Sequence, residues 1–376
     1  MARYRFEQIA FNSTEKKKPE ENDRHTYLGL EHLDSGCLKV TRFGADVAPI
    51  GDKLVMRKGD VLFGKRRAYQ KKVAIAPFDG IFSAHGMVLR PRENVVDPQF
   101  FPFFICSDYF LDAAIKISVG SLSPTINWRD LKNLEFNLPT LDEQRRLASV
   151  LQAITDTIET YKNLLSKTDE LVKSQFIELF GDVTSGQAKY PISTLGALAQ
   201  VWTGATPNRL VSDYYNGDIP WVKTGEIERG YITYTEESIT EKALSETNCK
   251  ILPEGSVMIA MYGQGKTRGT AGLLKIPATT NQACAAILPN PNLLPVFTYH
   301  YCVSQYNSLR NMGRGAQQAN LNLSLVKNFP IVVPPIEAQN RFAAFVEQLD
   351  KSKFELEQAL SELTLTYKRI LAENLG

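Results

Sequence analysis

The stretch Asn127-Trp-Arg-Asp-Leu-Lys-Asn-Leu-Glu-Phe-Asn-Leu-Pro139 recurs, with substitutions, as Asn322-Leu-Ser-Leu-Val-Lys-Asn-Phe-Pro-Ile-Val-Val-Pro334. The same offset aligns residues 120–181 with residues 315–376 without a gap. Identical pairs further along this alignment are Gln144 with Gln339, Arg146 with Arg341 and Ala148 with Ala343. A repeat of this length is far too long for a solenoid. It indicates two copies of one large unit.

The repeat also extends upstream of this stretch. Tyr27-Leu-Gly-Leu-Glu-His-Leu-Asp-Ser-Gly36 aligns with Trp221-Val-Lys-Thr-Gly-Glu-Ile-Glu-Arg-Gly230, and Lys58-Gly-Asp-Val-Leu aligns with Glu254-Gly-Ser-Val-Met. In the first copy the recognisable repeat begins close to Tyr27. A chain of 376 residues has room for two to three domains. We therefore expect a globular domain at 1–140, a helix at 141–181, a second globular domain at 182–335 and a second helix at 336–376.

The globular part of each copy alternates glycine-rich turns with short apolar or β-branched runs. The runs are Val61-Leu-Phe, Val73-Ala-Ile-Ala, Met87-Val-Leu, Val257-Met-Ile-Ala and Ala285-Ala-Ile-Leu. Such runs, bounded by turn residues, are typical of short strands. The pattern predicts the α+β class, with one compact mixed α/β domain in each copy.

The second part of each copy has the pattern of a long helix that begins after a proline-containing turn, with Asp142 or Glu337 near its positive end. Residues at alternating spacings of three and four form one stripe in each copy. The first stripe is Leu151, Ile154, Ile158, Tyr161, Leu165, Thr168, Val172, Gln175 and Leu179; the second is Val346, Leu349, Lys353, Leu356, Leu360, Leu363, Tyr367, Ile370 and Asn374. Heptads sustained this long are a coiled-coil signature. A helix of this kind could also pack only on its own domain, but two stripes in the same phase favour pairing with each other.

Composition limits the class of protein. Hydrophobic residues make up 43% and charged residues 22% of the chain, as in a soluble globular protein. No apolar run approaches the length of a membrane helix, and the charged start Met1-Ala-Arg-Tyr-Arg has no secretory apolar segment. We therefore expect a cytoplasmic protein. The five cysteines form no C-x-x-C pair and the four histidines do not cluster with them, so we expect no metal site.

The net charge of +2 hides two basic tracts. The segment from Arg57 to Arg92 contains nine Lys and Arg residues and only two Asp. The segment from Lys250 to Arg314 contains six Lys and Arg residues and a single Glu. A charge run is more often a solvated face. Two tracts at corresponding points of the repeat, mixed with glycine and tyrosine, favour loops that contact phosphates. The residues predicted to contact DNA are Lys65, Arg66, Arg67, Tyr69, Lys71, Lys72, Tyr262, Lys266, Thr267, Arg268, Arg314, Gln317 and Gln318.

The chain contains near matches to catalytic motifs but no complete one. Ala260-Met-Tyr-Gly-Gln-Gly-Lys-Thr267 is a loosened phosphate-loop pattern, but a phosphate loop must open a helix, and glycines and a proline come directly after it. Asp130-Leu-Lys132 has the local spacing of a nuclease site but corresponds to Leu325-Val-Lys327 in the other copy. The sequence contains no dinucleotide fingerprint, G-x-S-x-G or H-E-x-x-H, and no methyltransferase base pocket. No catalytic residue is predicted.

Several stretches resemble the target recognition domain of type I restriction-modification specificity subunits. They are Trp202-Thr-Gly-Ala-Thr-Pro207, Gly217-Asp-Ile-Pro-Trp-Val222, Gly225-Glu-Ile227, Leu252-Pro-Glu-Gly-Ser-Val-Met258 and Thr279-Thr-Asn-Gln-Ala283. Gly315-Ala-Gln-Gln-Ala-Asn-Leu321 and Phe329-Pro-Ile-Val-Val-Pro-Pro335 resemble the entry to that family's spacer helix. The likeness covers nearly the whole chain. The first copy departs from it because it has no clear Thr-Gly-x-Thr-Pro stretch.

The resemblance implies a noncatalytic subunit with two pseudo-twofold-related recognition domains, each contacting one half of a split DNA target. Two antiparallel coiled-coil helices would separate the domains and set the gap between the halves. Two methyltransferase subunits would bind the chain and carry S-adenosylmethionine, and separate ATP-dependent subunits would cut the DNA. Because Lys65-Arg66-Arg67 and Gln264-Gly265-Lys266 differ, we expect two different half-targets. The alternatives are a DNA-independent coiled-coil scaffold and a nucleotide-dependent enzyme that uses Gly265-Lys266-Thr267.

Overall fold

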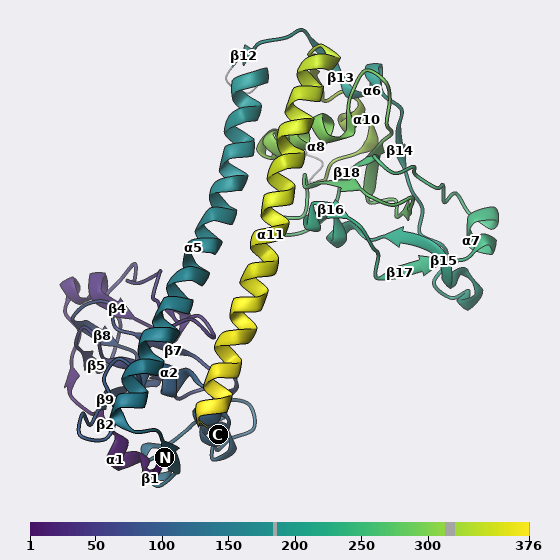
Figure 1. Ribbon diagram of the computed structural model, residues 1–376. Helices are drawn as coiled ribbons and strands as arrows, with labels where there is room; N and C mark the ends of the chain where they lie inside the picture. Colours follow the sequence, from purple (N-terminus) through teal and green to yellow (C-terminus); the bar gives the residue numbers. More distant parts are fainter. Residues whose placement is uncertain (183–185, 313–319, 376) are drawn as a thin grey trace. The chain divides into compact units, whose positions relative to one another are not determined.

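A computed structural model describes residues 1–182, 186–312 and 320–375 (Figure 1). The chain divides into two compact units. Unit 1 comprises Met1–Asn163 and Leu356–Gly376, and unit 2 comprises Leu164–Glu355. This division differs from the expected separation of globular domains from helices, because each unit contains a part of both long helices together with the domain on which those parts pack.

Unit 1 carries three small sheets. Their strand orders are β1-β10, β2-β9-β6-β7 and β3-β5-β8-β4. The elements are β1 (Ala2–Arg5), α1 (Phe6–Ile9), β2 (Ala10–Ser13), β3 (Lys16–Lys17), η1 (Glu21–Thr26), β4 (Tyr27–Leu28), η2 (Leu30–His32), β5 (Lys53–Met56), β6 (Val61–Gly64), η3 (Ala68–Gln70), β7 (Val73–Ile75), β8 (Gly80–Phe82), β9 (Gly86–Pro91), α2 (Phe101–Cys106), α3 (Asp108–Lys116), α4 (Trp128–Leu131), β10 (Glu135–Leu138) and the first part of α5 (Leu141–Phe180).

Unit 2 repeats this order with a larger central sheet. Its sheets are β14-β21-β18-β19-β16, β17-β15-β20, β13-β22 and β11-β12. The elements are β11 (Gly181–Asp182), β12 (Gln187–Ala188), β13 (Ile192–Thr194), α6 (Leu195–Leu198), β14 (Val201–Thr203), η4 (Ser212–Tyr214), β15 (Tyr215–Val222), η5 (Thr224–Arg229), β16 (Tyr231–Ile232), β17 (Glu237–Ile239), α7 (Glu241–Glu246), β18 (Val257–Ala260), β19 (Ala271–Leu274), β20 (Thr279–Thr280), β21 (Cys284–Ile287), α8 (Pro295–Ser304), α9 (Tyr306–Met312), α10 (Leu323–Lys327), β22 (Pro330–Val332) and the first part of α11 (Ile336–Leu375).

The mixed α/β architecture is confirmed, and each of the five predicted runs forms a strand: β6, β7, β9, β18 and β21. The sequence alignment of residues 27–36 with residues 221–230 is matched by equivalent strand pairing in the structure. Tyr27 and Leu28 pair in parallel with β8, as Trp221 and Val222 pair in parallel with β20. Residues aligned in the two copies therefore occupy equivalent strands.

The repeat in the first copy is recognisable in the sequence only from about Tyr27, but in the structure it begins well before this residue, within the expected domain 1–140. The Phe6 amide donates to the carbonyl of Leu134, as the Leu195 amide donates to the carbonyl of Phe329. β1 pairs with β10 as β13 pairs with β22, and a short helix follows each. The β1-α1-β2 segment is thus the structural counterpart of β13-α6-β14, although the two segments have almost no identical residues.

Each unit has a main core in which both long helices take part. In unit 1, Ala148 and Leu151 near the start of α5 share a core with Leu371 and Leu375 near the end of α11. In unit 2, the far end of α5 packs near the start of α11, where the rings of Phe176 and Phe342 lie 5.2 Å apart. The helices therefore run antiparallel, as the side-by-side ribbons show within each unit (Figure 1).

The heptad stripe describes the inner face of both helices. The predicted pairing residues Leu151, Ile154, Ile158, Tyr161, Leu165, Leu349, Leu356, Leu360 and Leu363 are all buried or half-buried. At its start α5 has a capping box, in which the Thr140 amide donates to Glu143 at 2.8 Å and the Glu143 amide donates back to the Thr140 hydroxyl. Within the described ranges, no helix combines the length and the apolar character that a membrane crossing requires.

A buried glutamine fastens each long helix to its own domain. In unit 1 the Gln144 side chain accepts from the Asp97 amide at 2.8 Å and donates to the carbonyls of Val95 and Pro139 at 3.1 and 2.9 Å. In unit 2 the Gln339 side chain accepts from the Leu294 amide at 2.8 Å and donates to the carbonyls of Asn292 and Pro334, both at 2.9 Å. The sequence identity of these two glutamines therefore reflects one repeated structural contact.

Candidate nucleic-acid interface

The two basic tracts contain equivalent hairpin loops. In unit 1 the loop 65–72 joins β6 to β7, and in unit 2 the loop 261–270 joins β18 to β19. The carbonyl of Lys65 accepts from the Ile126 amide at 2.9 Å, and the carbonyl of Met261 accepts from the Leu321 amide at 3.1 Å. Each loop thus leaves its strand against the same later segment of its copy. The fold places the basic residues that the repeat aligns at matching positions.

The unit 1 loop has an unusual backbone. A short turn, Ala68–Gln70, is flanked by Arg67 and Lys71, whose φ angles are +54° and +48°. This left-handed conformation costs a non-glycine residue about 1 kcal/mol and is over-represented at functional sites. The Ala68 amide also bonds the carbonyl of Pro124 at 3.2 Å. The surrounding segment therefore imposes the shape of the loop.

Only some of the predicted unit 1 residues are free to meet a ligand. Arg66, Arg67 and Tyr69 are exposed, and Tyr69 keeps 57% of its surface open. Lys65 is half-buried; burial, reinforced by the charge of Lys16, lowers the pKa of its amine. The Lys72 amine instead donates to the carbonyl of Leu30 at 2.7 Å.

Lys71 also makes internal contacts, unlike the free cation expected from the sequence. Its Nζ lies 2.6 Å from an Asp108 oxygen and 2.8 Å from an Asp112 oxygen, both on α3. Burial alone would lower the pKa of this amine, but hydrogen bonds to both carboxylates outweigh it and raise the pKa. Lys71 therefore stays protonated and shares its charge with two acids.

His85 belongs to this surface, although sequence reasoning did not select it. Its Nε2 lies 3.4 Å from Arg66 Nη1, and its carbonyl accepts from the Arg66 amide. Burial, followed by the charges of Arg66, Lys65 and Lys53, lowers the pKa of the His85 imidazole. No local pattern marks His85, because it comes close only when β8 and β9 fold beside the loop.

The unit 2 loop is rich in glycine and is held from one side. Lys266 and Tyr262 are exposed, Arg268 is half-buried, and the Thr267 hydroxyl donates to the Glu228 carboxylate at 2.6 Å. Gly269 adopts a φ of +86°, and a Cβ there would lie 3.2 Å from the Arg310 backbone nitrogen. Any other residue at this position would be strained, both by the positive φ and by its contact with the α9 backbone.

The element after this loop excludes the phosphate-loop alternative. Gly265-Lys266-Thr267 leads into strand β19, whereas a phosphate loop must open a helix. The predicted contacts Arg314, Gln317 and Gln318 lie outside the described residues. In the described part of the chain, no three His, Cys, Asp or Glu side chains are arranged to hold a metal ion.

Three of the stretches that carry the family resemblance, at 202–207, 217–222 and 279–283, form a structural junction in unit 2. A Cβ on Gly204 would lie 1.8 Å from the carbonyl oxygen of Thr280, whose strand pairs with β15. The Ala205 amide bonds that same oxygen at 3.0 Å, and the indole of Trp221 donates to the Ala205 carbonyl at 3.2 Å. These contacts therefore hold the start of the unit 2 domain against strands β15 and β20.

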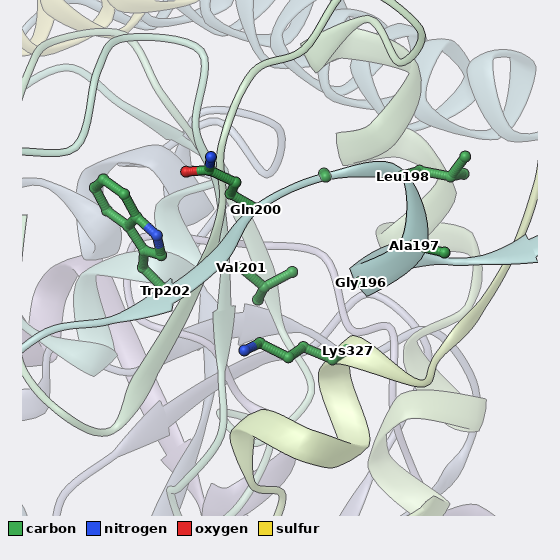
Figure 2. Close-up of a pocket in the computed structure, with 8 residues that line it drawn as sticks. Gly196, Ala197, Leu198, Gln200, Val201, Trp202 and Lys327 are labelled. Atoms are coloured by element: carbon green, nitrogen blue, oxygen red, sulfur yellow. The ribbon is translucent and has the colours of Figure 1, made fainter.

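An open hollow lies between α6, the start of β14 and α10. Figure 2 shows the Lys327 side chain running beneath the segment that carries Val201, with Gln200 and Trp202 further along it. In unit 1 the equivalent lysine, Lys132, has the Glu7 carboxylate 3.9 Å away. Gly196 takes the place of that glutamate in unit 2, so Lys327 has no equivalent acidic neighbour at this position. Those predicted DNA contacts that fall within the described ranges do not line it.

The fold defines a chain made of two copies of one α/β unit with two long helices, each copy presenting a basic hairpin. The chain belongs to the family described as the type I restriction modification DNA specificity domain, whose model matches residues 16–168 and 188–364. The two matched segments correspond in number and order to the two copies of the repeat.

Curated relatives are named as specificity subunits of type I restriction enzymes. The type I restriction enzyme EcoR124I/EcoR124II specificity subunit of Escherichia coli is 26% identical over 223 residues, which are 58% of this chain and 54% of that one. The MjaIX specificity subunit of Methanocaldococcus jannaschii is 24% identical over 282 residues, 69% of this chain and 63% of that one. The matched regions thus span less than two thirds of these two relatives.

Two solved structures share the fold over nearly the whole chain. One is described as "Structural basis underlying complex assembly and conformational transition of the type I R-M system". Its TM-score is 0.62 at 20% identity, and the alignment covers 99% of this chain and 97% of the solved chain. The type I restriction-modification S subunit from M. genitalium has a TM-score of 0.59 at 16% identity, covering 100% and 96%. At these identities the likeness concerns the fold.

Proposed function

We propose that this chain is the DNA-recognition subunit of a type I restriction-modification complex. Each unit contacts one half of a split target through its basic hairpin loop, and the chain itself carries out no chemistry. The observation that carries the proposal is the matching position of two basic loops in two repeated units of a specificity-domain protein. The loops differ in sequence, which supports two different half-targets.

The proposal includes partners that supply the chemistry. Two methyltransferase subunits bind this chain and hold S-adenosylmethionine, and ATP-dependent restriction subunits join the complex. One solved neighbour is described as concerned with complex assembly of the type I system, which supports an assembly of this kind. Sequencing the methylome of a strain that carries the gene with its partner would identify the target; methylation without a bipartite motif would contradict the proposal.

Replacing Lys65, Arg66 and Arg67 together by alanine should weaken target binding by the assembled enzyme about 10- to 100-fold at roughly 0.15 M salt, because phosphate contacts made by these side chains are lost. The slope of log affinity against log salt should fall by about 0.9 for each contact removed, up to roughly 3. The measurement is a salt titration of binding by fluorescence anisotropy.

The matched control removes the same charge from another exposed place. Lys162, Lys167 and Lys173 on α5 are exposed, and their replacement by alanine should leave the salt slope within about 0.5 of the wild-type value. If the loop variant keeps the wild-type affinity and slope, the unit 1 hairpin is not in the interface. If the wild-type complex itself does not bind DNA, the DNA-independent scaffold is the better explanation.

Inserting four residues into α5 near Thr168 should change the tolerated gap between half-targets or abolish recognition. Four residues lengthen a helix by about 6 Å and rotate the residues beyond the insertion by about 40°. The measurement is methylation of a set of targets whose halves are separated by different numbers of base pairs. A four-residue insertion in the exposed bend at 46–47 is the control, since it leaves both helices intact. An unchanged gap after the helix insertion would remove the spacer role.

A further inference from the structure

Both basic hairpins are held by the same element of their unit, the second of two short helices that come after the sheet. In unit 1 this helix is α3, and in unit 2 it is α9. The two attachments use opposite chemistry. In unit 1 the loop supplies the cation and the helix supplies the acids, whereas in unit 2 the helix supplies the cation and the loop supplies backbone carbonyls.

The unit 1 attachment is a three-membered ion cluster. Lys71, at the left-handed end of the loop turn, bridges Asp108 and Asp112, which lie one helical turn apart on α3. The side chain of Lys71 is one-third exposed, and both carboxylates are more exposed than it is. The cluster contains two negative carboxylates and one positive amine, so its net charge is negative. On a DNA-binding surface a negative cluster weakens the attraction to phosphates, so attraction to DNA does not explain its presence.

The unit 2 attachment captures three carbonyls of the loop. Arg310 donates from Nη1 to the Arg268 carbonyl at 3.2 Å and from Nη2 to the Gly265 carbonyl. The Tyr306 hydroxyl donates to the Lys266 carbonyl at 2.8 Å and accepts from Arg310 at 3.0 Å. Because these carbonyls turn toward α9, the loop is fixed along its length while the exposed Lys266 side chain stays free.

We propose that Lys71 and Arg310 are positioning residues, which fix the two hairpin loops in the shape that contacts DNA and do not themselves contact phosphate. The proposal rests on the proposed function, and it removes Lys71 from the predicted DNA contacts. Holding a loop in its bound shape raises affinity by reducing the conformational entropy lost on binding. The cost of two left-handed residues at Arg67 and Lys71 is consistent with a loop whose shape is imposed.

The first test separates charge from position by the sign of the effect. Replacing Asp108 and Asp112 by asparagine removes two negative charges, so electrostatics alone predicts tighter DNA binding by the assembled enzyme. Positioning predicts about tenfold weaker binding to the target, because two neutral amides hold the Lys71 amine less tightly than two carboxylates do. Binding to non-target DNA should not weaken. Tighter target binding by this variant would overturn the proposal.

Two controls accompany this test. Asp46 and Asp52 are exposed in the same unit, and their replacement by asparagine should leave affinity unchanged or slightly higher. Replacing Lys71 by methionine should weaken target binding without lowering the salt slope, and should add little loss in the D108N/D112N background. A slope that falls by about 0.9, as for a lost phosphate contact, would assign Lys71 to the interface instead.

The second test addresses unit 2 with a variant that keeps the charge. R310K remains cationic but cannot donate to two carbonyls in the fork that arginine provides. It should therefore reduce methylation of the split target by about tenfold and relax the sequence requirement at the half-target that Lys266→Ala also affects, while the sequence requirement at the other half-target is unchanged. Full activity of R310K would contradict the proposal. If the wild-type complex does not bind DNA, this result contradicts the proposed function and not the positioning role of Arg310.

Discussion

Replacing Phe176 by alanine should lower the free energy of unfolding by about 3–5 kcal/mol. Phe176 lies on α5 in unit 2 and is 2% exposed. Its ring centroid is 4.8 Å from that of Phe180, 5.6 Å from that of Phe297 on α8 and 5.2 Å from that of Phe342 on α11. One side chain thus joins both long helices to the domain. Its removal leaves a cavity that three elements would have to move to fill.

The measurement is urea unfolding of the full chain, followed by tryptophan fluorescence, since Trp202 and Trp221 lie in this unit. The matched control is Phe354→Ala, because Phe354 is on α11 of the same unit but is 60% exposed. The control should change stability by less than about 0.5 kcal/mol. Equal losses in the two variants would show that the aromatic cluster does not hold the helices to the domain.

This aromatic cluster marks where prediction from the sequence was incomplete. The heptad stripe identifies the face that each helix presents to the other, and its members are buried or half-buried. Phe176 and Phe180 lie off that stripe, yet they are among the most buried side chains of α5. The periodicity assumes one partner for each helix. At its ends each helix has two partners, so the buried face is wider than the stripe.

Within the globular domains, the sequence predicts those strands whose residues form continuous apolar runs. Buried strands such as β6 and β18 consist of apolar runs, which are visible without knowledge of the fold. The segment β1-α1-β2 lies inside the expected domain 1–140, but its counterpart in the second copy cannot be recognised from the sequence because Ala2-Arg-Tyr-Arg5 is mostly exposed and polar. Its place in the repeat is set by hydrogen bonds to β10, which lies at the other end of the domain's sequence. Such pairing leaves little trace in local sequence.

The candidate interface shows the same division between local and non-local information. Charge and repeat position were enough to place two basic loops at equivalent hairpins. They were not enough to separate free cations from internal ones, because Lys71 pairs with acids on α3 and Lys72 with the Leu30 carbonyl. Arg310 lies far along the chain from the carbonyls that it holds. The roles of these residues depend on contacts between distant segments.

Replacing Gln339 by methionine should cost about 3 kcal/mol of stability, although the two side chains have similar volumes. The glutamine is fully buried and serves the Leu294 amide and the carbonyls of Asn292 and Pro334. Methionine leaves these groups without partners, and each unsatisfied buried group costs about 1–3 kcal/mol. Gln144→Met should cost a similar amount in unit 1, where the same three contacts recur.

The exposed Gln348 on α11 provides the control, and Gln348→Met should be nearly neutral. Gln339→Glu adds a test by pH. Burial raises the pKa of such a carboxyl above its unfolded value of about 4.3, so this variant loses stability as the pH rises above that value. Lowering the pH should therefore recover part of the loss in Gln339→Glu and none of it in Gln339→Met. A loss in Gln339→Glu that does not change with pH would mean that the new carboxyl is not buried. A Gln339→Met variant as stable as the wild type would mean that the repeated glutamine is not what fastens each helix to its domain.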